Sequence, residues 1–501
     1  MKFLFQTKEL GAKVNKMLYN GAMISRIKAL FSKKSRVVTR FAPSPTGYFH
    51  AGSYRTAVFS YVFAKQNEGK FVLRIEDTDT LRSKKEFENN IIESLEWLGL
   101  PYDEMYRQSE RSEIYREYIE KLVAEDKAYV SKEEVVHNEE NGEKESRRGE
   151  PLRTEVIRFR NPNKKVRFND LIRGPIEFDT TELGDFVIAK SVTEPIFHFA
   201  VVLDDYLMGI THVIRGEDHI SNTPRQILIQ EALGAPTPTY AHLPLVLAHD
   251  RSKLSKRHGA QSMTFYRDEG YLPSALLNYM ALLGWNPGTD EEIFDLNGLV
   301  KNFDLSKVQK GGAVFNEEKL RWVNKEHMKR MSKATLALEI KKRIEASSRA
   351  QDLGWNVDRA TVERITPVIV ERIDTFGDIS KMIESLDLDY YFQDPNYDVL
   401  SLKWKEDKDL SGVKKHLESI KALIQSISDK NWTEEGIKAA IWPYAEREGR
   451  GPVLWPFRFA LSGKDKSPNP FTLASILGKE TTLRRIDEAH RRIERSAHAQ
   501  I

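Results

Sequence analysis

Two short apolar runs, separated by a sharp turn and an amphipathic segment, constrain the first part of the chain more than any other feature. RVVTRF is typical of a short buried strand, and APSPTG breaks it. The apolar side chains of SYRTAVFSYVFAKQ fall on one helical face, and KFVLRIED then alternates like a second strand about 30 residues after the first. This order predicts a βαβ unit with parallel strands, and so an α/β fold with a Rossmann-type sheet.

The remaining sequence predicts further domains, because 501 residues suffice for about three domains of about 150 residues each. The pattern is helical from Ser83 to Tyr129, and short β-like runs alternate with turns between Glu155 and Ala189. FHFAVVLDD and THVIRGEDH then resume strand-like runs. We therefore expect an α+β insertion that splits the parallel sheet. Beyond about Arg330 the pattern is helix after helix, which predicts an all-α C-terminal domain.

Composition excludes several classes of function. No apolar run approaches the roughly 18 residues of a membrane span, so no membrane association is expected. Lys plus Arg number 77 against 74 Asp plus Glu, so net charge does not argue for a nucleic-acid partner. The absence of cysteine excludes disulfides, thiolate nucleophiles and cysteine zinc sites, and it favours the cytoplasm.

The first 36 residues are basic, with nine Lys or Arg against the single acidic Glu9. Three interpretations stay open. The segment is a mitochondrial transit peptide, or a basic arm, or the result of an upstream start codon with the true start at Met17 or Met23.

Three charged residues fall at the carboxyl ends of predicted strands: Arg40, Glu76 and Arg215. Ligands of doubly wound sheets bind outside these ends. A carboxylate can pair with an α-ammonium group, and guanidinium groups can bind a side-chain carboxylate. Each residue alone fits a surface ion pair, but the three together predict a site for glutamate that disfavours the neutral glutamine.

The turn and the start of the following helix, GYFHAGSY, suit a nucleotide. Ser53 stands where a P-loop has lysine, so this is no P-loop. Gly47 and Gly52 instead let the backbone approach a phosphate at the helix N-terminus, with His50 as a hydrogen-bond donor. A lone histidine is more often structural, so the surrounding motifs decide.

A second basic cluster, DRSKLSKRHGA, contains Lys253 and Lys256 and follows the strand-like PLVLAH. A solvated basic surface is one interpretation. The other is a mobile lysine loop that stabilises charge on a polyphosphate in the transition state.

RFAPSPTGYFHAG, FVLRIEDTD, THVIRGEDHISNTPRQ and KLSKRHGAQS together resemble the bacterial and organellar glutamyl-tRNA synthetases, which are class I enzymes. FHAG is similar to the HIGH motif and KLSKR to the KMSKS loop. The resemblance runs from about Val37 to Leu320 and continues more loosely beyond. It implies a basic extension (1–36), the first half of a catalytic Rossmann core (37–115), a connective insertion that binds the acceptor end (116–189), the second half of the core (190–250), a KMSKS-like loop with a stem-contact region (251–330) and a helical anticodon-binding domain (331–501).

The resemblance also implies the roles of individual residues. Those for glutamate are Arg40, Ser44 and Arg215 on the side chain, Glu76 on the α-amino group, and Phe197 in the pocket wall. Those for ATP are His50, Gly52, Glu217, Lys253 and Lys256, of which His50, Lys253 and Lys256 are catalytic. Phe197 and Val201 depart from the pattern, because some members have a tyrosine and an asparagine there.

The implied reaction is ATP- and Mg²⁺-dependent formation of glutamyl-adenylate, followed by transfer of glutamate to the 3′ end of tRNA(Glu). Charging of tRNA(Gln) as well stays open. A monomer without zinc is expected. The candidate tRNA contacts are Arg147, Arg148, Lys307, Lys310, Arg372, Arg447 and Arg450.

Two alternatives remain. A glutaminyl-tRNA synthetase is disfavoured by APSPTGYFHAG and by the helical C-terminus, since that relative has PPEPNGYLHIGH and a β-rich anticodon domain. A non-catalytic tRNA-binding paralogue should have lost the ATP contacts His50, Lys253 and Lys256, which are present here.

Overall fold

The computed structural model describes residues 36–48, 51–132, 155–254, 261–405, 407 and 409–498. The chain divides into two compact units. The first ends at 264 and resumes over 273–317, and the second comprises 265–272 and the chain from 318 onward. No helix in the described ranges is long and apolar enough to cross a membrane.

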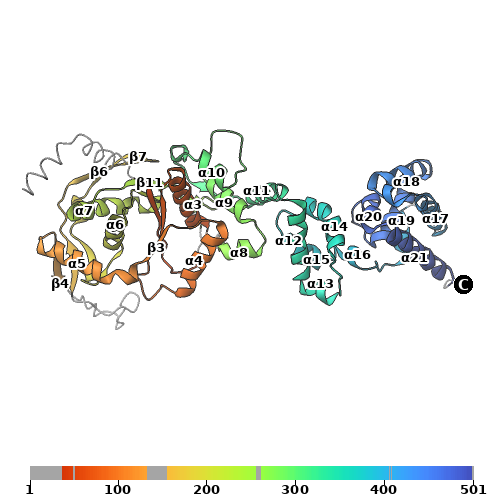
Figure 1. The fold of residues 1–501 in the computed structure, drawn as a ribbon, viewed down its shortest axis with the longest axis horizontal. Helices are drawn as coiled ribbons and strands as arrows, with labels where there is room; N and C mark the ends of the chain where they lie inside the picture. Colours follow the sequence, from red (N-terminus) through yellow and green to blue (C-terminus); the bar gives the residue numbers. More distant parts are fainter. Residues whose placement is uncertain are drawn as a thin grey trace, which may run out of the picture. The chain divides into compact units, whose positions relative to one another are not determined.

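The first unit is organised around a sheet with the order β3-β2-β1-β10-β11-β6-β7 (Figure 1). Only β7 is antiparallel to its neighbour. The strands are β1 (Val38–Phe41), β2 (Lys70–Ile75), β3 (Glu104–Arg107), β6 (Lys165–Asp170), β7 (Gly174–Asp179), β10 (His212–Gly216) and β11 (Thr239–Leu243). The helix α3 (Ala51–Gln66) connects β1 to β2, so the predicted βαβ unit and the parallel sheet are confirmed.

Helices cover both faces of this sheet, as Figure 1 shows. On one side lie α3 and α4 (Lys85–Leu98), which pack on α9 (Pro273–Leu282); α3 also packs on α10 (Leu296–Asn302). On the other side lie α6 (Phe197–Leu207) and α7 (Thr223–Leu233). These two helices share a core with α5 (Ser112–Ala124) and with side chains of β2, β10 and β11.

The segment predicted as an insertion contributes to two sheets. The strands β4 (Ala128–Lys132), β5 (Glu155–Phe159), β8 (Phe186–Ser191) and β9 (Glu194–Pro195) form an antiparallel sheet of their own. The hairpin of β6 and β7 instead extends the central sheet, since Asp170 pairs with Tyr240 of β11. This pairing places Asp170 beside Tyr240, and the Asp170 carboxylate accepts from the backbone N–H of His242 at 3.0 Å.

Two expectations about local structure were wrong. FHFAVVLDD is not a strand but most of α6, whose residues from Phe199 to Asp205 are all buried. A short apolar run buried on every side carries no period that separates a helix from a strand. The helical pattern from Ser83 to Tyr129 is also interrupted by β3, whose partly exposed residues show no alternation.

The first unit also contains a small parallel pair, β12 (Val246–Leu247) with β13 (Ala313–Val314). The second unit is helical in its described residues, as predicted, around a continuous apolar core. Its longer helices are α11 (Glu317–Lys329), α12 (Lys333–Glu345), α14 (Arg359–Arg372), α17 (Ser411–Gln425), α18 (Glu434–Glu448), α19 (Arg450–Ser462), α20 (Pro470–Leu477) and α21 (Lys479–His498).

Candidate active site

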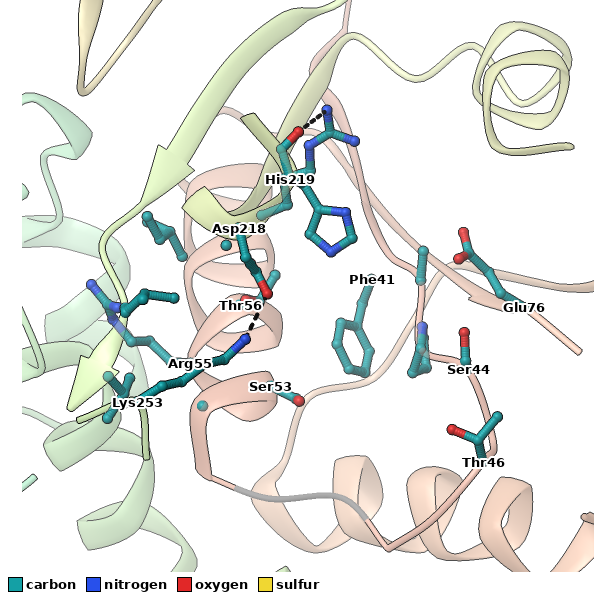
Figure 2. A pocket seen from close by; sticks show the side chains of 18 of the residues that line it. Phe41, Ser44, Thr46, Ser53, Arg55, Thr56, Glu76, Asp218, His219 and Lys253 are labelled. Atoms are coloured by element: carbon teal, nitrogen blue, oxygen red, sulfur yellow. Dashed lines mark hydrogen bonds and ion pairs between the residues drawn. The ribbon is translucent and has the colours of Figure 1, made fainter. Parts of the chain in front are cut away.

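A cavity of about 500 Å³ opens in the first unit beside the carboxyl ends of β1, β2 and β10 (Figure 2). Seven of the predicted site residues line it: Arg40, Ser44, Gly52, Glu76, Phe197, Arg215 and Lys253. Glu217 is not among the lining residues, and His50 and Lys256 lie outside the described residues. The cavity therefore collects residues from parts of the chain that are far apart in sequence.

The three charged residues predicted at strand ends meet because their strands are parallel neighbours. The strand β1 lies between β2 and β10. Arg40, Glu76 and Arg215 therefore all lie at the carboxyl ends of neighbouring parallel strands. All three are buried, with exposed fractions of 4%, 7% and 6%. A cavity with two guanidinium groups and one carboxylate at its wall suits a ligand that carries both signs of charge.

Arg215 is held from behind by a chain of hydrogen bonds. Its Nε donates to His242 Nε2 at 3.1 Å, and one Nη donates to Thr223 Oγ1 at 2.9 Å. His242 Nδ1 lies 2.7 Å from Asp170 Oδ2, and a carboxylate can only accept, so the proton of the neutral ring is on Nδ1. Burial lowers the pKa of His242 and also lowers that of Arg215, to about 10. His242 is therefore a neutral acceptor for Arg215.

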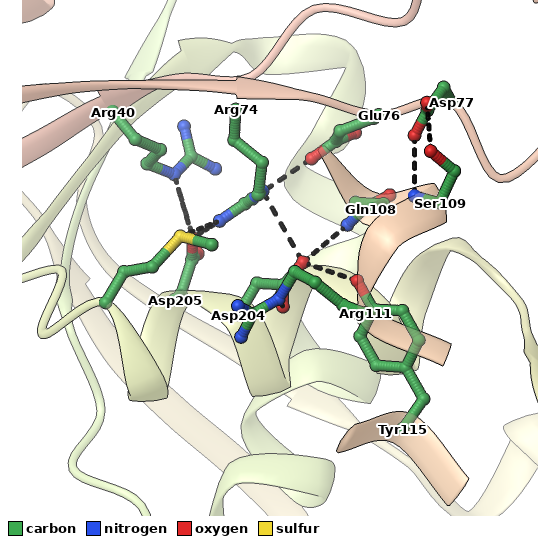
Figure 3. A network of polar contacts seen from close by, with 11 residues as sticks. Arg40, Arg74, Glu76, Asp77, Gln108, Ser109, Arg111, Tyr115, Asp204 and Asp205 are labelled. Atoms are coloured by element: carbon green, nitrogen blue, oxygen red, sulfur yellow. Dashed lines mark hydrogen bonds and ion pairs between the residues drawn. The ribbon is translucent and has the colours of Figure 1, made fainter. Parts of the chain in front are cut away.

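Arg40 and Glu76 are joined by two residues that the sequence did not predict (Figure 3). Arg40 Nε lies 3.3 Å from an Asp205 oxygen, and Arg74 contacts Asp205 at 2.6 Å and Glu76 at 3.0 Å. Burial raises the pKa of Glu76. Burial alone would raise the pKa of Asp205 too, but Arg40 and Arg74 hold it below its ordinary value. The sequence signal that could have identified Arg74 and Asp205 was a charged residue in an apolar run, in KFVLRIED and in FHFAVVLDD.

A further part of the cavity wall comes from α6 and the segment after β10. Phe197 and Val201, one helical turn apart, both line the cavity. The Phe197 ring lies 5.7 Å from the ring of His219. Burial lowers the pKa of His219 to about 4, and it lowers that of the neighbouring His198 to about 4. The part of the wall formed by Phe197, Val201 and His219 is therefore uncharged near neutral pH.

The loop after β1 lines the cavity with Gly47 and with Ser44, which lies near Glu76 in Figure 2, and the start of α3 with Gly52 forms the other end of the cavity. Lys253 reaches this end and donates to Asp218 at 2.9 Å, as the dashed line in Figure 2 shows. Glu217 lies behind the wall, where it accepts from the Leu245 backbone at 2.7 Å. The exposed lysine beside a helix start suits a phosphate group.

The predicted tRNA contacts that fall within the described residues are exposed. In the second unit Arg372 pairs with Asp387 at 2.7 Å, and Arg447 pairs with Glu448 at 2.9 Å. Arg450 lies over the Trp442 ring at 4.6 Å. In the first unit Lys307 and Lys310 are not among the residues that line the cavity. Arg147 and Arg148 lie outside the described residues.

Comparison with known families covers both units. Residues 36–151 and 131–322 match the family described as tRNA synthetases class I (E and Q), catalytic domain. Residues 327–490 match the anticodon binding domain. The glutamate--tRNA ligase of Aquifex aeolicus is 43% identical over 481 residues, which cover 90% of this chain and 98% of that protein. The chain belongs to the glutamate--tRNA ligase family of class I tRNA synthetases.

Further relatives agree with this assignment. Glutamate--tRNA ligase 2 of Thermoanaerobacter pseudethanolicus is 40% identical over 484 residues, covering 91% of this chain and 98% of the relative. A crystal structure of a glutamate tRNA ligase from Elizabethkingia meningosepticum in complex with its amino acid superposes with a TM-score of 0.78. It is 33% identical and covers 91% of this chain and all of that one. The fold of this synthetase is thus that of a class I aminoacyl-tRNA ligase, as the sequence motifs predicted.

Proposed function

We propose that this synthetase activates L-glutamate with ATP and transfers it to the 3′ end of tRNA(Glu). The observation that carries the proposal is the meeting of Arg40, Arg215 and Glu76 at one cavity. The names of the relatives support glutamate as the amino acid.

In the proposed complex the glutamate side-chain carboxylate binds the free nitrogens of Arg40 and Arg215, with Ser44 as a further donor. Glu76 accepts from the α-ammonium group, and Phe197 packs against the methylene groups. Glutamine is disfavoured because its neutral amide would leave two buried guanidinium groups without an anion, which costs about 1–3 kcal/mol or more. The uncharged wall with Phe197 and Val201 leaves this discrimination to the arginines.

The nucleotide occupies the other end of the cavity, against Gly52 and the N-terminus of α3. His50 donates to a phosphate oxygen, and Lys253 and Lys256 stabilise the triphosphate as negative charge shifts toward pyrophosphate. Glu217 accepts from the backbone of Leu245, which lines the cavity. Glu217 therefore affects nucleotide binding indirectly, by positioning this part of the wall.

In the proposed reaction an oxygen of the glutamate α-carboxylate attacks the α-phosphorus and pyrophosphate leaves with the bonding electron pair. A hydroxyl of the terminal adenosine of tRNA then attacks the activated carbonyl, and AMP leaves. No side chain needs to act as a nucleophile, because the site works by positioning and by stabilising charge.

Magnesium fits this site as a companion of the nucleotide. The described residues contain no group of three or more acidic or histidine side chains that could hold a metal ion. Magnesium commonly binds to substrate phosphates with only one or two carboxylates. We therefore propose that the triphosphate itself would hold the ion, which would supply charge neutralisation there.

The tRNA is proposed to contact the insertion (116–189) with its acceptor end, the region 251–330 with its stem and the helical domain (331–501) with its anticodon. Arg372 and Arg447 are the proposed contacts in the last. A monomer in the cytoplasm is proposed, with mitochondria as the alternative if residues 1–36 are a transit peptide. Charging of tRNA(Gln) is the open part of the proposal.

The test is charging with radiolabelled glutamate on transcripts of tRNA(Glu) and tRNA(Gln), with glutamine and aspartate as control amino acids. Charging of tRNA(Glu) is the expected result, and charging of that tRNA alone would establish a discriminating synthetase. Charging of both tRNAs would place the enzyme in an indirect route to glutaminyl-tRNA. Failure to charge either tRNA, with tRNA still bound, would refute the proposal in favour of a non-catalytic tRNA-binding protein.

A further inference from the structure

We propose that Asp205 and Arg74 are positioning residues of the amino-acid site. Together they set the separation between Arg40 and Glu76, and through it the preference for glutamate over the shorter aspartate. This inference rests on the proposed function, in which Arg40 and Glu76 bind opposite ends of the amino acid.

The first observation is how Arg40 is held. Its Nε lies 3.3 Å from Asp205, and both side chains are nearly fully buried. No contact of the two terminal nitrogens of Arg40 is found among the described residues, and Figure 3 shows them pointing away from Asp205. Asp205 therefore fixes the direction of the guanidinium group while it leaves the two outer nitrogens for a ligand.

The second observation is that one rigid group joins Asp205 to Glu76. Arg74 is fully buried and uses one terminal nitrogen for Asp205, at 2.6 Å, and the other for Glu76, at 3.0 Å. A guanidinium group is planar, so the two carboxylates it joins cannot change their separation freely. Asp205 and Arg74 thus connect Arg40 to Glu76 without any mobile segment between them.

The third observation is the place of Asp205 on its helix. Phe197, Val201 and Asp205 are spaced by four residues and therefore lie along one face of α6. The first two line the cavity, and the third lies where that face meets Arg40. The helix that forms the apolar wall also carries the anchor of Arg40, so a shift of Asp205 changes the width of the site.

The expected consequence is selection by the length of the amino-acid substrate. Aspartate lacks one methylene of glutamate, so it cannot reach both Glu76 and Arg40 while their separation is fixed. An apolar pocket distinguishes one methylene by only about 10- to 200-fold. A fixed pair of charged contacts adds to this, because the shorter substrate leaves one buried charge without its partner.

The neighbouring Asp204 provides a matched control. It lies on the same helix and is fully buried, and it accepts from Arg111 at 2.7 Å and from Gln108 and Tyr115 at 2.9 Å each. It also lies 3.9 Å from Arg74 Nε, but among the described contacts it has none with Arg40 or Glu76 (Figure 3). Asp204→Asn therefore makes the same chemical change at the same depth without touching the groups that bind the amino acid.

The experiment compares the full-length enzyme with its Asp205→Asn, Asp204→Asn and Arg74→Lys variants. It measures KM for glutamate and for ATP in tRNA-dependent ATP–pyrophosphate exchange, kcat/KM for glutamate and aspartate, and the melting temperature. Asp205→Asn is expected to raise the KM for glutamate at least about tenfold and to lower the glutamate-to-aspartate preference about tenfold. The KM for ATP should stay within about twofold, because the change is confined to the amino-acid end of the site. Loss of folded enzyme would instead lower the apparent kcat and change neither KM.

Asp204→Asn is expected to lower the melting temperature about as much as Asp205→Asn does. It should leave the KM for glutamate within about twofold of the wild-type value. Equal effects of the two aspartate variants, or an unchanged preference in Asp205→Asn, would overturn the inference. If Asp205→Asn does not fold, Arg74→Lys decides, because it keeps the charge but loses the planar bridge and should reduce the preference in the same way. A wild-type enzyme that does not activate glutamate would instead refute the proposed function itself.

Discussion

Replacement of His242 by asparagine should weaken glutamate binding without a contact between His242 and the substrate. His242 Nε2 accepts from Arg215 Nε at 3.1 Å, and its Nδ1 donates to Asp170 at 2.7 Å. The asparagine amide occupies the place of Nδ1 and can still donate to Asp170. It is too short to reach Arg215, so the Nε–H of a 6% exposed arginine loses its acceptor.

The size of the effect follows from this lost acceptor. A buried donor without a partner costs about 1–3 kcal/mol. If Arg215 moves from its binding position to find another acceptor, this energy is lost from glutamate binding. The KM for glutamate then rises between about 5- and 150-fold, since 1.4 kcal/mol corresponds to a factor of ten. The KM for ATP should change little, because His242 is not among the residues that line the cavity.

The assay is ATP–pyrophosphate exchange in the presence of tRNA, with glutamate and ATP varied in turn. His242→Gln is the matched control: its side-chain oxygen can reach the position of Nε2, so it should restore most of the affinity even though the contact with Asp170 is lost. An equal rise in KM for both variants would refute the reasoning, because it would show that the volume of the ring, and not its acceptor, holds Arg215.

Three further predictions concern protons and the lysine of the nucleotide end. Burial raises the pKa of Glu76, so on acidification the KM for glutamate should begin to rise at a higher pH than it would with an ordinary carboxyl group. In Glu76→Gln the KM for glutamate should be high and nearly independent of pH. Measurement of this KM across pH in both enzymes checks the prediction. Asp218→Asn frees Lys253 from an exposed pair worth up to about 1 kcal/mol, so the KM for ATP should fall by at most about fivefold in exchange kinetics. The pKa values of His198 and His219 are lowered by burial to about 4, so the unfolded chain binds more protons below about pH 6.5; the free energy of unfolding in urea should fall as pH falls from about 6.5 to about 4, by up to about 3 kcal/mol per histidine.

The part of the site that could be predicted from the sequence is the part that follows from topology. Arg40, Glu76 and Arg215 each end a strand that carries a recognisable apolar pattern. Once the strands are parallel neighbours, their carboxyl ends must meet. The helical second unit was predictable for a similar reason, since long segments with a 3.6-residue period leave little ambiguity.

The supports behind these residues were not predictable in the same way. The anchor of Arg40 lies on α6, and the apolar run of α6 favoured a strand. His242 and Asp170 come together only because the hairpin of β6 and β7 adds to the central sheet beside β11. Nothing in the local pattern around Asp170 distinguishes an edge of the central sheet from a strand of the separate antiparallel sheet.

A charged residue inside an apolar run indicates that a buried partner of opposite charge exists, which the apolar pattern alone does not indicate. A buried charge is costly unless it is paired, so Arg74 near the end of β2 and the adjacent aspartates in α6 each require a partner. Arg74 and Asp205 are 131 residues apart, so the sequence indicates the need for a partner but not which residue meets it. Because these pairs lie directly behind Arg40 and Glu76, the same requirement that stabilises the core also fixes the groups proposed to bind the substrate. The selectivity of the site is then a property of the sheet and of α6 together, which is why the paired test of Asp205 and Asp204 separates positioning from stability.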